Sequence, residues 1–232
     1  MKKYVIVIAS FLILCTSCSV SRKVTYSLKD YKPSTENVNK SISIQLFDDI
    51  RFTNEENQFY QTATSNQKKI DGNFNCITAE KYYKIPVNQQ MTDMFVNYLK
   101  KKEYFSNVFV NQKDIADYYV TAKIKNFTGY QAYSAGAAIG AQFGLIGALV
   151  TAGIKTEGKI VIEIVDIQIF DKNGNEVAFI DDISQIFEGK MLADAYCWCI
   201  YGNLNQKLSL IYEDFGDKIF KAILTKNILI EK

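Results

Sequence analysis

The chain has 232 residues, of which 48% are apolar and 22% are charged, and its formal net charge is +2. These proportions are typical of a globular protein, and no overall basic charge is present that would attract nucleic acid. Histidine is absent from the sequence, which excludes Ser-His-Asp triads, Cys–His dyads and histidine metal sites.

The first 17 residues have the pattern of a secretory leader. A basic start, Lys2 and Lys3, precedes an uncharged apolar stretch of 11 residues, 4–14, and small residues follow. This stretch is well short of the roughly 20 residues that a helix needs to cross a bilayer core. We therefore expect residues 1–17 to be removed as a signal peptide, which leaves 25 basic and 25 acidic side chains.

Residues 15–18, Cys-Thr-Ser-Cys, resemble the lipobox of bacterial lipoproteins. The resemblance implies that a diacylglyceryl group is attached to the cysteine after the cleavage point and that the new amino terminus is acylated, with palmitate or a similar chain. We assign this lipid to Cys18, because the small Ser17 precedes it whereas the bulky Leu14 precedes Cys15. Two or more acyl chains anchor a protein stably to a membrane.

The alternative is an ordinary leader with two incidental cysteines. No acidic cluster of the kind that sends some lipoproteins to the cell surface follows Cys18. We therefore expect a lipid-anchored protein of the cell envelope, at the outer membrane and facing the periplasm. Residues 18–38 are polar and are predicted to form the lipidated terminus and its tether, and residues 39–232 to form a single domain.

The first expected strand, 41–48, alternates clearly, with Ile42, Ile44 and Leu46 on one face. Residues 51–81 have weak patterning and predict no definite element. A helix is expected after Pro86, with Lys100-Lys101-Lys102 in its last turn, where cations suit the helix dipole. Its apolar positions recur at spacings of three and four residues: Val87, Met91, Met94, Phe95, Tyr98 and Leu99.

Residues 105–110 and 117–125 predict two further strands, the second of which places Tyr118, Val120, Ala122 and Ile124 on one face. A third runs from Gly158 to Phe170 and is followed by Asn173-Gly174 and the apolar run 177–180. Asn-Gly between two apolar runs predicts a β-hairpin. A calcium loop is the weaker interpretation, because the glycine is not at the sixth position.

The last long helix is expected over residues 203–225, where an apolar stripe runs along one face, and residues 228–230 could add a short strand. The elements together predict an α+β domain, with a mainly antiparallel sheet and two long helices packed on one of its faces, plus a Gly/Ala-rich apolar insertion.

That insertion, residues 132–154, belongs to an uncharged run from Asn126 to Ile154. Gly136, Gly140 and Gly144 recur at every fourth position, which resembles the glycine-zipper segments of several outer-membrane lipoproteins. Three interpretations stay open. The segment could pack as a helix on its own domain, it could insert into a membrane or associate with other copies of the chain, or it could be a loop.

Three cysteines remain in the domain: Cys76, Cys197 and Cys199. In an exported protein Cys76 could form a disulfide with either of the other two, or all three could stay reduced and buried. The carboxylates Asp181 and Asp182 are expected on opposite faces of a strand, so they do not form a catalytic pair. The sequence therefore predicts no enzyme, no catalytic residue, no metal site and no cofactor.

The lipobox, residues 116–120 leading into a strand, and the hairpin 161–180 together resemble a group of envelope lipoproteins that includes the TolB amino-terminal domain and CsgG. The resemblance implies a small sheet with two helices over residues 40–230. The expected function is a non-catalytic structural, assembly or partner-docking lipoprotein. It would contact the membrane through its lipid, envelope proteins as partners, other copies through the glycine segment, and no nucleic acid. The alternative is an accessory lipoprotein that binds a small apolar or lipid ligand for envelope transport.

Overall fold

The computed structural model describes residues 32–53, 74–77, 83, 85–132, 136, 139–140, 143, 153–192 and 198–230. The expected signal peptide, Cys18 and most of the tether lie outside these residues. The described elements, in chain order, are β1 (Val38–Ile44), β2 (Asp48–Asp49), β3 (Phe74–Ile77), α3 (Val87–Lys102), β4 (Phe105–Val110), η2 (Lys113–Ile115), β5 (Tyr118–Ala132), β6 (Lys155–Asp171), β7 (Glu176–Ile180), β8 (Ile183–Leu192) and α6 (Trp198–Ile230).

The described strands form one sheet of mixed direction, in the order β4-β1-β5-β6-β7. The prediction of a mainly antiparallel sheet is correct only for β5, β6, β7, β8 and β3, because β1 runs parallel to both β4 and β5, and β2 also runs parallel to β5. The physical reason is the connection through α3. The α3 helix, between β1 and β4, returns the chain to the end of the sheet where β1 begins, so β4 runs in the same direction as β1.

The long hairpin of β5 and β6 is the spine of the sheet, paired from Tyr118↔Asp171 to Gln131↔Gly158. The hairpin predicted at Asn173-Gly174 is confirmed: it joins β6 to β7, and Gly174 has a φ of +84°. Residues 126–132 of the uncharged run belong to β5 rather than to the glycine-rich insertion. The insertion therefore connects the end of β5 to the start of β6, at one end of this hairpin.

The outer partner of β6 is a strand in two parts, β7 and β8, which meet at Asp181 and Asp182. Asp166 of β6 lies opposite this break with a φ of +51°, and its N–H donates to Asp182 Oδ1 at 3.3 Å. The sequence interpretation that Asp181 and Asp182 occupy opposite faces of one strand is therefore wrong, because both lie between strands. Against β5, β6 has one extra residue between Val165 and Gln168, which is a β-bulge, and β5 has one extra residue between Ile124 and Asn126, so the two irregularities cancel in the register.

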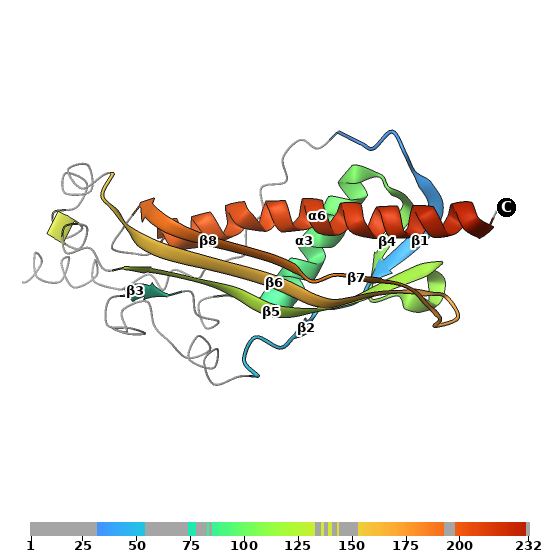
Figure 1. Cartoon of the computed structure of the whole chain (residues 1–232), viewed down its shortest axis with the longest axis horizontal. Coiled ribbons are helices and arrows are strands. Elements are labelled where there is room, and N and C mark those ends of the chain that lie inside the picture. Colours follow the sequence, from blue (N-terminus) through green and yellow to red (C-terminus); the bar gives the residue numbers. More distant parts are fainter. Residues whose placement is uncertain are drawn as a thin grey trace, which may run out of the picture.

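The two long helices bury their apolar faces in the same core as the strands. In Figure 1, α6 runs along the length of the sheet and α3 runs across the sheet. The predicted inward positions of β5 and of α3 are confirmed for Val120, Ile124, Phe95 and Leu99, each fully buried. Phe95 of α3 stacks on Phe215 of α6 with ring centroids 4.3 Å apart. This aromatic contact joins the two helices.

Two predicted elements are corrected, and one strand was missed. β1 ends at Ile44, and Leu46 is 40% exposed rather than part of the buried face. Residues 228–230 continue α6 instead of forming a strand, because 33 residues of continuous helix leave no turn before them. β8 was not predicted, since its inward positions include Gln185 and Gly189 and the apolar alternation is weak.

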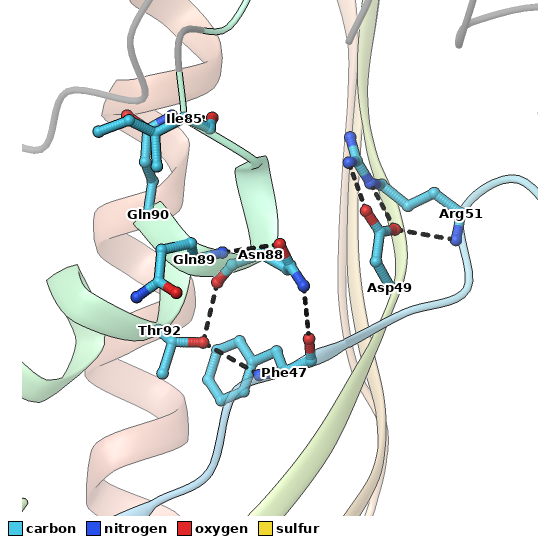
Figure 2. Close-up of polar contacts among 8 residues, drawn as sticks. All are labelled: Phe47, Asp49, Arg51, Ile85, Asn88, Gln89, Gln90 and Thr92. Carbon is cyan, nitrogen blue, oxygen red and sulfur yellow. Dashed lines mark hydrogen bonds and ion pairs between the residues drawn. The ribbon is translucent and has the colours of Figure 1, made fainter. Parts of the chain in front are cut away.

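The first two turns of α3 hold the segment after β1 through hydrogen bonds, as Figure 2 shows. The N–H of Phe47 donates to Thr92 Oγ1 at 3.0 Å, and Asn88 Nδ2 donates to the carbonyl of Phe47 at 3.1 Å. Further along the chain, the buried Arg51 makes a two-pronged ion pair with Asp49 at 2.7 and 2.9 Å. These contacts satisfy backbone groups that would otherwise be buried without partners.

Asp117, the residue before β5, connects β1 to β5. Its carboxylate accepts hydrogen bonds from the backbone N–H and the Oγ of Ser41, both at 2.8 Å, and Ser41 Oγ accepts one from the N–H of Asp117 at 3.0 Å. Burial raises the pKa of Asp117, but the hydrogen bonds from Ser41, with Lys40 and Lys172 nearby, outweigh burial and hold this pKa below its ordinary value.

This lowered pKa predicts an acid-sensitive junction. A carboxylate whose pKa is lower in the folded state stabilises the fold above the ordinary pKa of an aspartate, about 4, and loses that contribution as the pH falls through the folded value. We expect the urea concentration at the midpoint of unfolding to decrease as the pH is lowered from 5 to 2. The Asp117→Asn protein should be less stable at pH 6, and its stability should depend less steeply on pH. Equal slopes for the two proteins would contradict this role of Asp117.

Candidate functional site

The structure leaves most of the site residues predicted from sequence untested. Cys18, Gly144 and Cys197 lie outside the described residues, and the backbone alone is described at Cys76, in β3, and at Cys199, in α6. The disulfide prediction and the lipidation prediction therefore stay predictions.

Gly136 and Gly140 lie in helical backbone, Gly136 exposed and Gly140 buried. Ile139 and Phe143 are 56% and 70% exposed beside them. Exposed apolar side chains next to a buried glycine fit either packing on the domain or contact with another surface, so the three interpretations of this segment stay open.

A groove of about 870 Å³ lies between the end of β8 and the first turns of α6. In Figure 1 this is the end of the sheet where the β8 arrowhead lies beside the start of α6. The groove is lined by Lys155, Ile160, Ile186, Phe187, Glu188, Gly189, Lys190, Met191, Leu192, Gly202, Asn203, Gln206 and Lys207. One wall is therefore a strand and the other a helix.

The strand wall alternates along β8. Phe187 and Met191 are partly buried and pack against the core, whereas Ile186, Glu188 and Lys190 are exposed. Between them Gly189 has a φ of +143°, a conformation that residues with a side chain rarely adopt, and the space where its Cβ would lie is open. The strand wall is therefore bare backbone at Gly189.

The end of β8 is held to the centre of the sheet by a side chain from β5. Gln131 is buried, and its Nε2 donates to the carbonyls of Met191 and Leu192 at 3.1 and 2.8 Å. The intervening strand has a glycine here: a Cβ on Gly158 would lie 2.8 Å from the sulfur of Met191. The absence of a side chain at Gly158 leaves room for the Met191 side chain.

Two rows of α6 residues form the helix wall, and the members of each row are four positions apart in the sequence. Gly202 and Gln206 form the exposed row, and Asn203 and Lys207 form the half-buried one. Nothing lies within 4 Å of the position that a Cβ on Gly202 would take. The ammonium of Lys207 lies over the ring of Phe187, 4.2 Å from its centroid, and links the two walls at the base of the groove.

The groove is basic. Lys155, Lys190 and Lys207 line it, and none of the three makes an ion pair with another described residue. Lys207 lies on α6, whereas Lys155 and Lys190 alternate to the exposed side of their strands, opposite to the side that packs towards α6, and Glu157 is the cross-strand partner of Lys190. The single lining carboxylate, Glu188, is bound to Lys159 at 2.5 Å. The groove therefore has an excess of positive charge, and a ligand with negative charge would complement it.

A smaller pocket of about 460 Å³ lies at the bulge of β6 and is lined by Leu46, Asp48, Thr121, Ala122, Lys123, Asp166, Gln168 and Phe179. Lys123 and Asp166 of this pocket form an ion pair at 2.9 Å, and Asp48 is the third charged residue of its lining. The pocket is smaller than the groove beside β8 and its lining has one negative charge in excess, against two positive charges in excess for the groove, which makes the groove the better candidate site.

Within the described part of the chain, no three Cys, Asp or Glu residues gather as metal ligands would. None of the described helices is both long and apolar enough to span a membrane. Sequence reasoning missed the groove because its strand wall, β8, was not predicted, so the start of the predicted helix 203–225 had no partner element to form a groove with. The one available signal was the pair Gly189 and Gly202 on either side of a chain reversal.

The chain matches no protein-family model and no curated protein. Its fold is similar to a Xanthomonas campestris protein of the family model DUF330, with a TM-score of 0.52 and 8% identity, over 88% of this chain and 97% of that one. The neuraminyllactose-binding hemagglutinin homolog of Helicobacter pylori gives a TM-score of 0.41 at 10% identity, over 92% of this chain and 100% of that one.

PelC of Paraburkholderia phytofirmans, solved as a dodecamer, gives a TM-score of 0.33 at 10% identity, over 79% of this chain and 89% of that one. Of these three structures, the Xanthomonas campestris protein has the highest TM-score. The chain therefore shares its fold with that DUF330 protein.

Proposed function

We propose that this protein is a lipid-anchored, non-catalytic lipoprotein of the bacterial cell envelope that docks a partner protein in the groove between β8 and α6. The observation that carries the proposal is the open groove, walled by a sheet edge and a helix and lined by three lysines that make no ion pair with another residue in the described part of the chain. The leader and the lipobox-like residues before Cys18 supply the anchor.

The length of the tether fits a domain held close to a membrane surface. Thirteen residues, 19–31, separate Cys18 from the first described residue, which limits their span to about 45 Å when fully extended. The chain then meets the end of α3, where the N–H of Ser34 donates to the carbonyl of Lys102 at 2.8 Å. Lys100, Lys101 and Lys102 lie in this last turn of α3, where their positive charges interact favourably with the negative end of the helix dipole.

Replacing Cys18 with serine is expected to abolish acylation and to move the protein from the membrane fraction to the soluble fraction, because a serine has no sulfur to accept the diacylglyceryl group. The measurement is intact-mass spectrometry after growth with a palmitate analogue, together with cell fractionation. Cys15→Ser is the matched control and should keep both the lipid and the membrane fraction. A Cys18→Ser protein that still fractionates with membranes would reject the proposed anchor.

A transport accessory that binds a small apolar or lipid ligand is the second candidate. The volume of the groove lies within the roughly 300–1,000 Å³ of small-molecule sites. Such sites are mainly apolar, however, and three lysines and a glutamate line this one. The docking of a charged protein segment therefore agrees better with the lining.

A further inference from the structure

We propose that the groove binds an extended, acidic segment of the partner, which adds to the free edge of β8 as a new strand. This inference rests on the proposed docking function and specifies how the partner is recognised. Three features of the described residues support it: an unpaired strand edge, open space on both walls, and unbalanced lysines.

The strand edge comes first. Among the described strands β8 pairs only with β6, through Ile183↔Ile164 to Leu192↔Lys155. The other edge of β8 therefore presents N–H and C=O groups that a further strand could bind. Gln131 already occupies the carbonyls of Met191 and Leu192, so the available stretch is Ser184–Lys190. Seven residues are enough for main-chain recognition of a peptide strand.

The space beside this edge comes second. Among the described residues, no atom lies within 4 Å of the Cβ position of Gly189 on the strand or of Gly202 on the helix. An added strand directs every second side chain towards α6, and those side chains would enter the volume that the two glycines leave open. The groove thus has room for a strand with side chains rather than for a bare backbone.

The charge comes third. Lys155, Lys190 and Lys207 make no ion pair among the described residues, and Glu188 is neutralised by Lys159. An occupant with acidic side chains would bring the groove to electrical balance, whereas a basic one would add to the repulsion. An added strand that alternates glutamate and valine would direct its valines towards α6 and its carboxylates to the exposed side of the sheet, where Lys155 and Lys190 lie.

The test uses the full lipidated chain in detergent and three fluorescent octapeptides: one alternating Glu and Val, one alternating Lys and Val, and the Glu-Val peptide N-methylated at alternate residues. We expect the Glu-Val peptide to bind, the Lys-Val peptide to bind at least tenfold more weakly, and N-methylation of the amides facing β8 to abolish binding. Hydrogen–deuterium exchange should slow at the amides of Ser184–Lys190 when the Glu-Val peptide is bound.

Substitutions locate the binding to the groove. Lys190→Glu should weaken binding of the Glu-Val peptide at least tenfold. Lys226→Glu, the same charge change at an exposed position far along α6, should change this binding by less than twofold. Gly202→Trp should block binding by filling the groove, whereas Leu210→Trp, at an exposed position of α6 outside the groove lining, should change it by less than twofold. Both tryptophan variants are checked for an unchanged circular dichroism spectrum.

Several outcomes would overturn strand addition. They are no binding by the Glu-Val peptide, equal binding by its N-methylated form, equal binding by the Lys-Val peptide, and no change in exchange along β8. Displacement of the Glu-Val peptide by anionic phospholipid vesicles, with no slowed exchange, would identify a lipid-headgroup surface instead. None of these results alters the Cys18 experiment, so failure of this inference and failure of the proposed anchor are distinguishable.

Discussion

Replacing Phe215 with alanine is expected to lower the free energy of unfolding by about 3–5 kcal/mol. The Phe215 side chain is fully buried, it stacks on Phe95 at 4.3 Å with an interplanar angle of 7°, and its ring lies 5.9 Å from that of Phe47. One ring therefore joins α6, α3 and the segment that follows β1. Its removal would leave a cavity at the point where these three elements meet.

Urea denaturation followed by circular dichroism would measure this loss, and thermal melting should show a fall of the order of 10 °C. Phe179→Ala is the matched control, because the Phe179 side chain is 55% exposed on β7 and its removal should change stability by less than about 0.5 kcal/mol. A loss below about 1 kcal/mol at Phe215 would show that the aromatic stack is not the main contact between the two helices.

Two glycines of the same helix are expected to respond to alanine with opposite signs. At Gly216 a Cβ would lie 2.5 Å from Cε1 of Tyr98 and 3.3 Å from Cδ2 of Leu99. The Tyr98 ring cannot easily move away, because it is buried and its hydroxyl is hydrogen-bonded to Tyr104, which in turn donates to Asp217. Gly216→Ala should therefore destabilise the protein by about 2 kcal/mol, the usual cost of overpacking a core.

At Gly202 the same change meets open space. Alanine favours the helix over glycine by up to about 1 kcal/mol, so Gly202→Ala should stabilise the protein by about 0.5–1 kcal/mol. Parallel urea denaturation of the two variants is the measurement. Stabilisation by both substitutions would mean that α3 and α6 do not approach each other as closely as described at Gly216.

The short-range features of the chain could be predicted from residue patterns alone. The helix after Pro86, the strand 105–110 and the Asn173-Gly174 hairpin are all confirmed. Each depends on local chemistry: apolar residues at helical spacing, alternation along a strand, or a dipeptide that favours positive φ. The expected buried face of β5 is confirmed for the same reason, since Tyr118, Val120, Ala122 and Ile124 alternate with polar residues.

Features that depend on long-range contact were missed or only partly predicted. The parallel pairing of β1 with β4 and β5 depends on the path through α3, which no pattern within a single strand reveals. β8 is held by pairing with β6 and by Gln131 rather than by its own alternation. The glycines that matter for packing, Gly158 and Gly216, were not distinguished from the others, because the atoms they make room for come from distant parts of the chain.

The sequence by itself determined the elements whose signal lies within a few consecutive residues, the exclusion of histidine chemistry, and the prediction of a lipid on Cys18. Only the tertiary structure decided the mixed direction of the sheet, the crossing of α3 and α6 at Gly216, and the lysine-lined groove beside β8. The physical reason is that a groove and a helix crossing are properties of two surfaces brought together. The residues of each surface carry no sign of the other until the chain has folded.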